Sequence, residues 1–409
     1  MTNQKGPEMR FAKLMAGVLS LCVSAALVSC GSDPAHGAAV TATDRPNASP
    51  APSSTASASA APTTAYVAIE VGSGTASAVH IVDLTGKLVA AAGLAAFPTV
   101  SVAGVGSHGV YIAGPGHKLG RLELDGKVHP LDATPAGDAG EMVGLAESPD
   151  GTQWAYSLVS FANDTNLTAT TRVYVASSGS PTRQVAVLKR PELSSASSSE
   201  RYGGGYSVLR WDPAGLLLGS HPTGVGGVGP FISEGYGLNN VVRMDPNSGQ
   251  ASGRISPSGC RFGDIASDGT VACVSDSGIT VTGAAGSATA PVPGLQSDHP
   301  AANLAFVGGS DRLIYSVATF SDASQPAWTD ALMVATRSGG HLSSTTVARS
   351  LSSRSENGHT WSHVVDANIV AVIAGAADNS KLALLTIASG TMVTLGAADA
   401  IDGVFHAAS

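Results

Sequence analysis

Residues 141–161, EMVGLAESPDGTQWAYSLVSF, begin the clearest repeat unit of the sequence. Apolar and aromatic runs flank residues 148–151 (Ser-Pro-Asp-Gly), in which Asp-Gly supplies the positive φ that a tight β-hairpin requires. A second such pair, TTRVYVASSGSPTRQVAVLKR, follows at residues 170–190 and turns at a Ser-Gly dipeptide. The whole unit therefore predicts four antiparallel strands joined by two tight turns and one longer loop.

The same four-strand pattern recurs along the chain, and no long amphipathic helix interrupts it. Residues 65–94 predict only three strands, whereas 402–409 (DGVFHAAS) predict a first strand with no second strand after it. A ring closed by both termini explains both features, because closure protects sheet edges. We therefore predict an all-β fold: a β-propeller of seven blades, with six or eight as alternatives, in which the C-terminal strand is the innermost strand of blade 1. The complete units are 99–131, 141–190, 206–256, 262–292, 303–347 and 362–395.

The repeat resembles those of TolB-like and WD-type propellers, most clearly at residues 148–151 followed by Trp154-Ala155-Tyr156. The resemblance covers roughly residues 65–409, but only this unit carries the motif intact; 212–213 and 267–269 are partial echoes. TolB itself has six blades, so the resemblance is to the repeat. It implies a propeller and leaves the function open.

The N-terminal region predicts export and a lipid anchor. Residues 14–29 are uncharged, follow basic residues, and are too short for a membrane span but suited to a signal peptide. Residues 27–30 (Leu-Val-Ser-Cys) resemble the bacterial lipobox, which implies cleavage before Cys30 and diacylglycerol on its thiol. An ordinary secretory signal is the alternative.

Three segments follow from this interpretation. Residues 1–29 are a lipoprotein signal peptide, 30–64 a lipidated, disordered tether rich in Ala, Ser, Pro and Thr, and 65–409 the propeller. We therefore expect attachment to the cell membrane through the N-terminal lipid, on its extracytoplasmic face.

The composition limits the classes of partner that we expect. The net charge is −8, only 13% of residues are charged, and Lys and Arg form no cluster, so nucleic acid is not expected as a partner. The sequence has no His-Glu-Xaa-Xaa-His, Cys-Xaa-Xaa-Cys or Ca²⁺-loop motif, and we assign no cofactor, metal or catalytic residue.

Polar residues in or just before predicted first strands are candidates to line the central channel. Asp298, His299, His363 and Asp366 are such residues, and Asp264 is a further one. They suit either a metal or acid–base site, or a set of water-holding channel groups; we favour the latter.

Cys260 and Cys273 are an even pair in a chain predicted to be exported, which suggests a disulfide. A two-residue turn at Asp268-Gly269 would instead place Cys273 opposite Asp264, about 13 Å along the strand from Cys260. The bridge then requires Cys260 to fold back from the preceding loop. Both alternatives remain open.

Loop length points to a binding face. Long connections are predicted at 159–171, 191–205, 220–240, 318–330 and 351–361, between second and third strands or between blades. In a propeller both classes of loop emerge on one face, and binding residues concentrate on such loops. The candidate binding residues, chosen as aromatic or polar side chains, are Phe161, Arg201, Tyr202, His221, Phe231, Tyr236, Phe320, Trp328 and Trp361.

We therefore favour a tethered recognition or scaffold module that binds an envelope protein, a peptide or a wall glycan. The alternatives are a propeller enzyme of lyase or lactonase type, acting at the channel mouth, and an assembly subunit that docks through an apolar rim. A cation bound by clustered acids and histidines would favour the enzyme, whereas a flat aromatic face would favour binding.

Overall fold

In the computed structural model every regular element of the described residues is a β-strand. None of these residues forms a helix long and apolar enough to cross a membrane. The structure describes residues 63–72, 77–93, 101–114, 118–131, 140–161, 169–190, 203–222, 241–255, 260, 262–275, 278–284, 286–290, 301–320, 328–352, 362–375 and 379–408.

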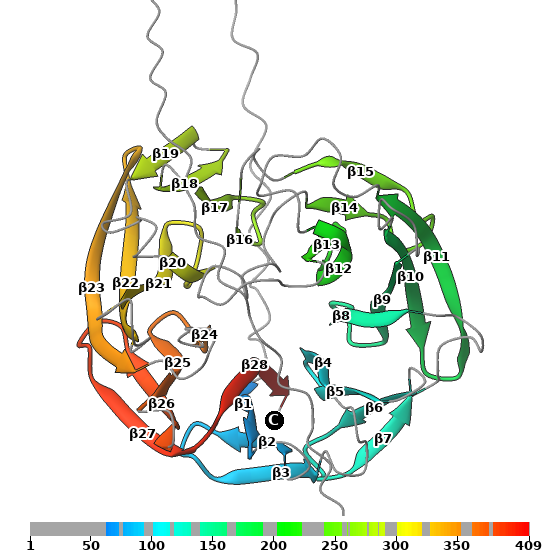
Figure 1. The fold of residues 1–409 in the computed structure, drawn as a ribbon, viewed down its shortest axis with the longest axis horizontal. Coiled ribbons are helices and arrows are strands. Elements are labelled where there is room, and N and C mark those ends of the chain that lie inside the picture. The colour runs from blue at the N-terminus through cyan, green and yellow to red at the C-terminus, as the bar shows by residue number, and fades with distance from the viewer. Residues whose placement is uncertain are drawn as a thin grey trace, which may run out of the picture. The chain divides into compact units, whose positions relative to one another are not determined.

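Seven four-stranded antiparallel sheets follow one another around a ring, which confirms the seven-bladed propeller and excludes six or eight blades (Figure 1). Blades 1 to 3, each from its innermost strand outward, are β28 (Ala400–Ala408), β1 (Thr63–Val71), β2 (Ala78–Asp83), β3 (Leu88–Gly93); β4 (Ser101–Gly106), β5 (Gly109–Gly114), β6 (Lys118–Leu122), β7 (Val128–Leu131); and β8 (Glu141–Glu147), β9 (Gln153–Phe161), β10 (Ala169–Ser177), β11 (Ser180–Arg190).

Blades 4 to 7 repeat this order. They are β12 (Gly203–Asp212), β13 (Gly215–Pro222), β14 (Val242–Met244), β15 (Ala251–Arg254); β16 (Phe262–Ile265), β17 (Val271–Ser275), β18 (Gly278–Gly283), β19 (Gly286–Ala290); β20 (Ala301–Phe306), β21 (Arg312–Phe320), β22 (Trp328–Ser338), β23 (His341–Ser352); and β24 (Ser362–Val364), β25 (Ile369–Ala374), β26 (Lys381–Thr386), β27 (Met392–Ala397).

The two ends of the described chain close the ring. β28 pairs antiparallel with β1 from Thr63↔Ala408 to Glu70↔Ala400, which confirms that the C-terminal strand is the inner strand of blade 1. Tyr66 stacks on Phe405, with ring centroids 5.5 Å apart. Blade 1 therefore holds together only when the C-terminal strand is in place.

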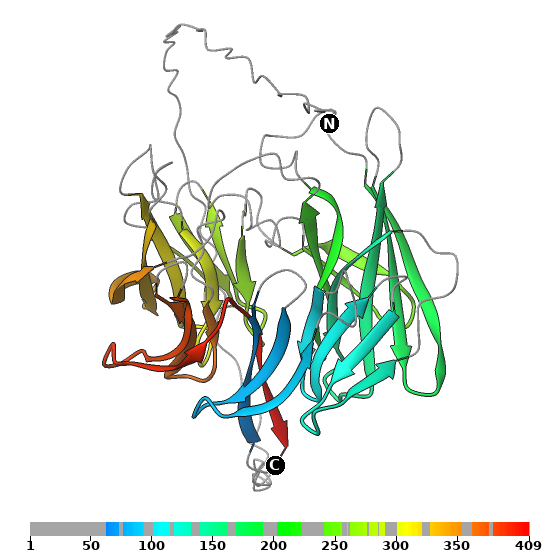
Figure 2. The ribbon, with the colours of Figure 1, turned by 60° about the horizontal axis from the view of Figure 1, so that its bottom comes forward.

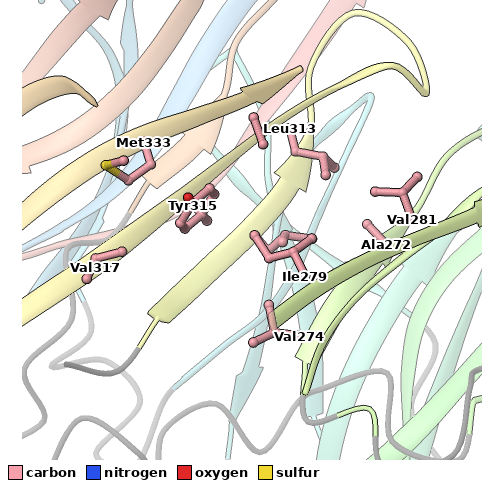
Figure 3. Close-up of a cluster of buried hydrophobic side chains, with 10 residues drawn as sticks. Ala272, Val274, Ile279, Val281, Leu313, Tyr315, Val317 and Met333 are labelled. Carbon is pink, nitrogen blue, oxygen red and sulfur yellow. The ribbon is translucent and has the colours of Figure 1, made fainter. Parts of the chain in front are cut away.

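Alternating apolar residues face the neighbouring blades and build the core there. Between blades 5 and 6, Ile279 and Val281 pack with Leu313, Tyr315 and other buried side chains (Figure 3). Blade 3 contributes two large aromatic residues of its repeat motif, Trp154 and Tyr156, which are fully buried. Each full burial of such a side chain contributes about 1.5–3 kcal/mol, so the propeller is stabilised at the blade interfaces.

Aspartates close many of the tight turns. Asp150 Oδ1 accepts hydrogen bonds from the Ser148 hydroxyl and from the backbone and side chain of Thr152, while Gly151 takes φ +70°. These hydrogen bonds lower the pKa of Asp150. Asp-Gly turns therefore act here as local stabilisers, which is why they mark the repeat in the sequence.

Glycines in three turns, which we call the glycine latches, pack closely against the outer strand of the preceding blade. Gly86, Gly249 and Gly390 each have positive φ, and a Cβ on any of them would collide with the outer strand of the preceding blade. The residues they approach, Leu395, Val185 and Val347 in that order, are the unpaired residues of bulges in β27, β11 and β23. A bulge turns the outer strand locally, and the glycine then fits against it.

The two faces of the ring differ in the length of their connections. Because the strands alternate in direction, turns between first and second, and third and fourth, strands share one face, which we call the turn face. Its longest turn joins Met244 to Ala251. On the opposite loop face, 223–241 join β13 to β14 and 191–202 join β11 to β12. Thr63 and Ala408 lie at the turn face, at the lower end of the ribbon in Figure 2.

Candidate functional site

The predicted binding residues fall largely outside the described residues. Four lie at strand ends on the loop face: Phe161 ends β9 opposite Ala169, His221 is opposite Gly205, and Phe320 is opposite Trp328. Only their backbones are described. Arg201, Tyr202, Phe231, Tyr236, Trp361, Asp298, His299 and Cys30 lie outside the described residues.

Asp264 is on β16, an innermost strand, and connects three blades. Its carboxylate accepts hydrogen bonds from the backbone N–H of Ile265 (2.7 Å) and of Phe306 on β20 (2.9 Å), and lies 3.7 Å from Arg210 Nη1 on β12. Burial raises the pKa of Asp264, and these neighbours oppose that rise. Its side chain is nevertheless 31% exposed, so water reaches the carboxylate. These contacts suit a structural clamp between blades.

His363 lies on β24, the innermost strand of blade 7, beside the start of β28. Burial lowers the pKa of His363 to about 4, and a hydrogen bond with the backbone of Ile401 opposes this shift. The imidazole is therefore neutral at pH 7. Asp366 is not on the inner strand: it is exposed in the turn after β24, where its Oδ1 accepts the N–H groups of Asn368 and Ile369. The grouping of Asp366 with His363 in the channel is wrong, because the short β24 ends before it.

The sequence pattern does not single out Asp402, an acid whose pKa burial strongly perturbs. Asp402 is the unpaired residue of a bulge in β28, because Ala68 pairs with Gly403 and Ile69 with Ile401. Its Oδ2 is buried without a hydrogen-bond partner. Burial, together with the Glu70 carboxylate, raises the pKa of Asp402 to about 8, so this carboxyl is mainly protonated at pH 7. Burial and Asp399 also raise the pKa of Glu70.

Equivalent bulges occur in other inner strands, but with apolar or small residues. The unpaired residues are Ala103 in β4, Gly144 in β8 and Leu209 in β12. A bulge re-aims a side chain and is common beside functional sites. Asp402 is thus a polar residue at a bulge position that holds an apolar or small residue in blades 2, 3 and 4. An alignment of the repeat units at Val102, Val143 and Val208 could have revealed this difference from the sequence.

His363 and the pair Glu70–Asp402 lie on the strands that close the ring. At neutral pH the His363 imidazole is uncharged and the Asp402 carboxyl carries a proton. No group of three His, Cys, Asp or Glu side chains able to hold a metal ion occurs among the described residues. The groups available here at pH 7 are a neutral imidazole and a protonated carboxyl.

Cys260 and Cys273 form a disulfide, with their Cα atoms 5.5 Å apart. The expected register was wrong by one residue. Cys273 lies opposite Gly263, because the turn from Ile265 to Val271 is wider than a two-residue Asp-Gly turn. Cys260 reaches Cys273 from the segment before β16, and both side chains are buried.

Ser107, His108 and Glu147 come together on the turn face between blades 2 and 3. The Ser107 hydroxyl is 3.0 Å from His108 Nδ1, but Glu147 Oε1 also contacts this nitrogen, at 2.9 Å. A hydrolytic triad needs the serine on one ring nitrogen and the carboxylate on the other. Glu147 additionally accepts hydrogen bonds from the Ser107 hydroxyl and from Tyr111 Oη. The cluster therefore joins two blades and lacks the geometry for nucleophilic catalysis.

A groove of about 520 Å³ opens on the turn face of blade 4, beside Trp211. Its charged groups are engaged locally: Arg243 pairs with Asp212, and Asp245 accepts the N–H groups of Asn247 and Ser248. Arg183 of blade 3 donates to the backbone carbonyl oxygens of Pro246 and Asn247 and holds this turn in place. The groove is accordingly an element of blade packing.

Comparisons with known proteins find similarity only to solved structures, and only at low sequence identity. No protein-family model and no curated protein matches the chain. Solved structures that are similar include a protein from Lactobacillus plantarum, with 14% identity, TM-score 0.49, and 84% of this chain and 99% of that chain covered. Another is a protein assigned as TolB from Agrobacterium tumefaciens, with 14% identity, TM-score 0.37, and 70% and 90% covered. An uncharacterized Listeria monocytogenes protein has 14% identity, TM-score 0.43, and 74% and 84% covered.

Proposed function

We propose that this propeller is a lipid-anchored recognition module on the extracytoplasmic face of the cell membrane, which binds an envelope protein, a peptide or a wall glycan through its loop face. One observation carries this proposal: the long connections all leave one face, whereas the chain enters the propeller on the other. Thr63, the first residue of β1, lies beside Ala408 at the turn face.

The direction of the anchor follows from this topology. Lipid on Cys30 followed by a tether rich in Ala, Ser, Pro and Thr would reach the propeller at Thr63. A tether of this composition in the polyproline limit extends about 3 Å per residue. The tether would then be attached on the turn face and would leave the loop face free for a partner in the surrounding envelope.

The rigid ring supports binding by long loops. The packed blades and short turns hold the strand ends in place. Binding loops are commonly carried on rigid scaffolds of this kind. Phe231, Tyr236 and Trp328 are the aromatic residues that we expect to dominate affinity, since aromatic side chains bury large areas at low entropic cost.

The test is capture of the partner by crosslinking in intact cells. Replacing 223–240 by a short turn should abolish capture while leaving the melting temperature nearly unchanged, because each doubling of loop length costs only about 0.6 kcal/mol. Trp328→Ala and Tyr236→Ala should each weaken binding by about 2 kcal/mol or more.

Asn247→Ala on the turn face is the matched control, because the hydrogen bonds of Asn247 with Arg183 and Asp245 use its backbone atoms. It should leave capture unchanged. If Asn247→Ala abolished capture while the loop deletion retained it, the binding face would be the turn face beside the Trp211 groove.

The second candidate is an enzyme of lyase or lactonase type at the channel mouth. The observation in its favour is Asp402, a carboxyl held protonated near the channel by burial and by Glu70. A protonated carboxyl can serve as a general acid. Loss of a measurable turnover in Asp402→Asn, with the fold retained, would support this activity over pure recognition.

A further inference from the structure

The longest connection between described strands ends at a buried residue. Residues 223–241 join β13 to β14, and Val241, the last of them, is 0% exposed. β13 continues to Pro222, still paired with β12, whereas the pairing of β13 with β14 ends at Leu218↔Val242. Val241 therefore lies one residue beyond that ladder. Strand pairing holds the start of this connection, and burial holds its end.

The disulfide lies in the cluster that buries Val241. Val241, Cys260 and Cys273 belong to one apolar cluster between blades 4 and 5, whose other buried members are Leu217, Ile265 and Val271. Cys260 precedes β16 and is bonded to Cys273 on β17, so the bond ties the chain that enters blade 5 to the second strand of that blade. The two cysteines are 1% and 2% exposed. Buried structural cysteines are chemically inert, so this bond acts as a fixed link.

A backbone hydrogen bond joins Val241 to the segment that carries Cys260. The N–H of Ile255, directly after β15, donates to the carbonyl oxygen of Val241 (2.9 Å). Ile255 also packs against the cluster and begins the segment that leads to Cys260. The end of the long connection and the junction between blades 4 and 5 therefore meet in the cluster that holds the disulfide.

We propose that the Cys260–Cys273 disulfide positions the connection 223–241 for binding, because it fixes the cluster that holds Val241. The inference rests on the proposed function, in which this connection supplies binding residues. A loop loses conformational freedom when it binds, and holding one of its ends in place beforehand reduces that loss. The cysteines touch no partner in this role and act through Val241. Without the bond, Cys260 and Ile255 can shift, and the end of the connection loses its fixed position.

The first measurement is hydrogen exchange of the Ile255 amide in the purified full chain. This N–H donates to Val241, so its exchange rate reports whether the end of the connection is held. Replacing both cysteines, Cys260→Ala with Cys273→Ala, should raise the rate at least about tenfold at temperatures well below the melting transition. A melting curve of the same variant distinguishes local release from loss of the fold.

A second pair of variants leaves the disulfide intact and does not depend on the folding of a chain without the bond. Val241→Ala truncates a 0% exposed side chain of the cluster and should also raise the Ile255 exchange rate at least about tenfold. Val281→Ala is the matched control, since Val281 is equally buried but lies on β18 in the cluster between blades 5 and 6 (Figure 3). It should leave that rate unchanged.

Partner capture by crosslinking in intact cells is the second readout. The double cysteine variant and Val241→Ala should each weaken capture at least about tenfold, whereas Val281→Ala should keep it within about twofold. An unchanged Ile255 rate in the double cysteine variant would overturn the inference. Should that variant not fold, an unchanged rate in Val241→Ala would do so.

The same readouts separate this inference from the proposed function. A raised Ile255 rate with unchanged capture would overturn the positioning role if deletion of 223–240 abolishes capture. If that deletion leaves capture unchanged, the proposed function fails, and the exchange rate alone decides whether the disulfide fixes Val241.

Discussion

Tyr66, on the first described strand, stacks on Phe405, near the C-terminus, with ring centroids 5.5 Å apart. The contact lies on the pair of strands that closes the ring, and both rings belong to the apolar cluster shared by blades 1 and 2. A separation of more than three hundred residues in sequence is thus bridged at the one blade assembled from both ends of the chain.

Removing the closing strand should destabilise the whole propeller. Deletion of 400–409 takes the inner strand from blade 1 and exposes the edge of β1, so we expect loss of the single cooperative melting transition. Phe405→Ala should lower the free energy of unfolding by about 3–5 kcal/mol, as truncation of a buried aromatic does. Val187→Ala, at an exposed site, should change it by less than about 0.5 kcal/mol. Melting that is unchanged by the deletion would mean that the ring closes elsewhere.

The glycine latches should tolerate alanine poorly. Gly390 has φ +67°, and a Cβ there would lie 2.7 Å from the Val347 carbonyl oxygen. Gly179 has a similar φ of +73° but open space around it, so it measures the cost of backbone strain alone. We expect Gly390→Ala to be less stable than Gly179→Ala by about 1–3 kcal/mol, because the neighbouring outer strand must shift. Chemical denaturation of both variants measures the difference, and equal losses would contradict the latch.

Asp402 should make stability fall as pH rises. Its pKa is about 8 in the folded protein against an ordinary value of 3.8, so the folded state binds more protons than the unfolded state between about pH 4 and pH 8. Across that window the contribution of Asp402 becomes progressively destabilising. Asp402→Asn removes the titration, and its advantage over the parent should grow to about 1–3 kcal/mol at pH 8, after allowance for solvent screening.

His363 should act in the opposite direction. Its pKa is lowered to about 4, so the unfolded state binds more protons below about pH 6.5 and stability is lost as pH falls toward 4. His363→Gln should flatten this acid limb and leave the alkaline limb intact. Melting temperatures from pH 4 to pH 9 separate the two residues; an unchanged acid limb in His363→Gln would count against the buried, neutral imidazole.

The disulfide should be present in the exported protein and stabilise blade 5. Cys260 and Cys273 are separated by 13 residues, for which loop closure contributes about 3 kcal/mol. The double variant Cys260→Ser with Cys273→Ser should be less stable by about this amount. Thiol titration of the denatured parent should find both cysteines protected until reductant is added, and two free thiols would contradict the bridge.

Processing at Cys30 tests the anchor separately from the propeller. Cys30→Ala should leave the precursor uncleaved or release the protein into the medium, because the thiol that would carry the lipid is gone. Fractionation and labelling with a radioactive fatty acid provide the measurement. Normal processing with membrane retention of Cys30→Ala would remove the lipoprotein interpretation.

The blade count was predictable because it depends on local pattern. Asp-Gly and Ser-Gly turns between alternating apolar runs define each hairpin, and those turns are stabilised within a few residues, as at Asp150. The closing strand was predictable for the same reason: an unpaired strand pattern at one end matched a missing strand at the other.

The site was far less predictable. His363 and Asp264 lie on inner strands, as their positions suggested, but Asp366 belongs to a turn. The buried position of Asp402 depends on a β-bulge that the sequence of this strand alone does not reveal. The error in the predicted register of Cys273 has a similar origin, because the turn between Ile265 and Val271 is wider than the two-residue turn that the sequence predicted. The predicted aromatic and polar side chains of the loop face stay predictions.

Alternation and turn chemistry act within one hairpin, so the sequence was sufficient to predict the strands, the tight turns, the number of blades and the closing strand. Which residues of different blades meet depends on how the blades pack in the complete ring. Glu70 comes beside Asp402, Cys260 beside Cys273, and Gly390 against Val347, because bulges and inter-blade packing set register over distances that no local pattern encodes.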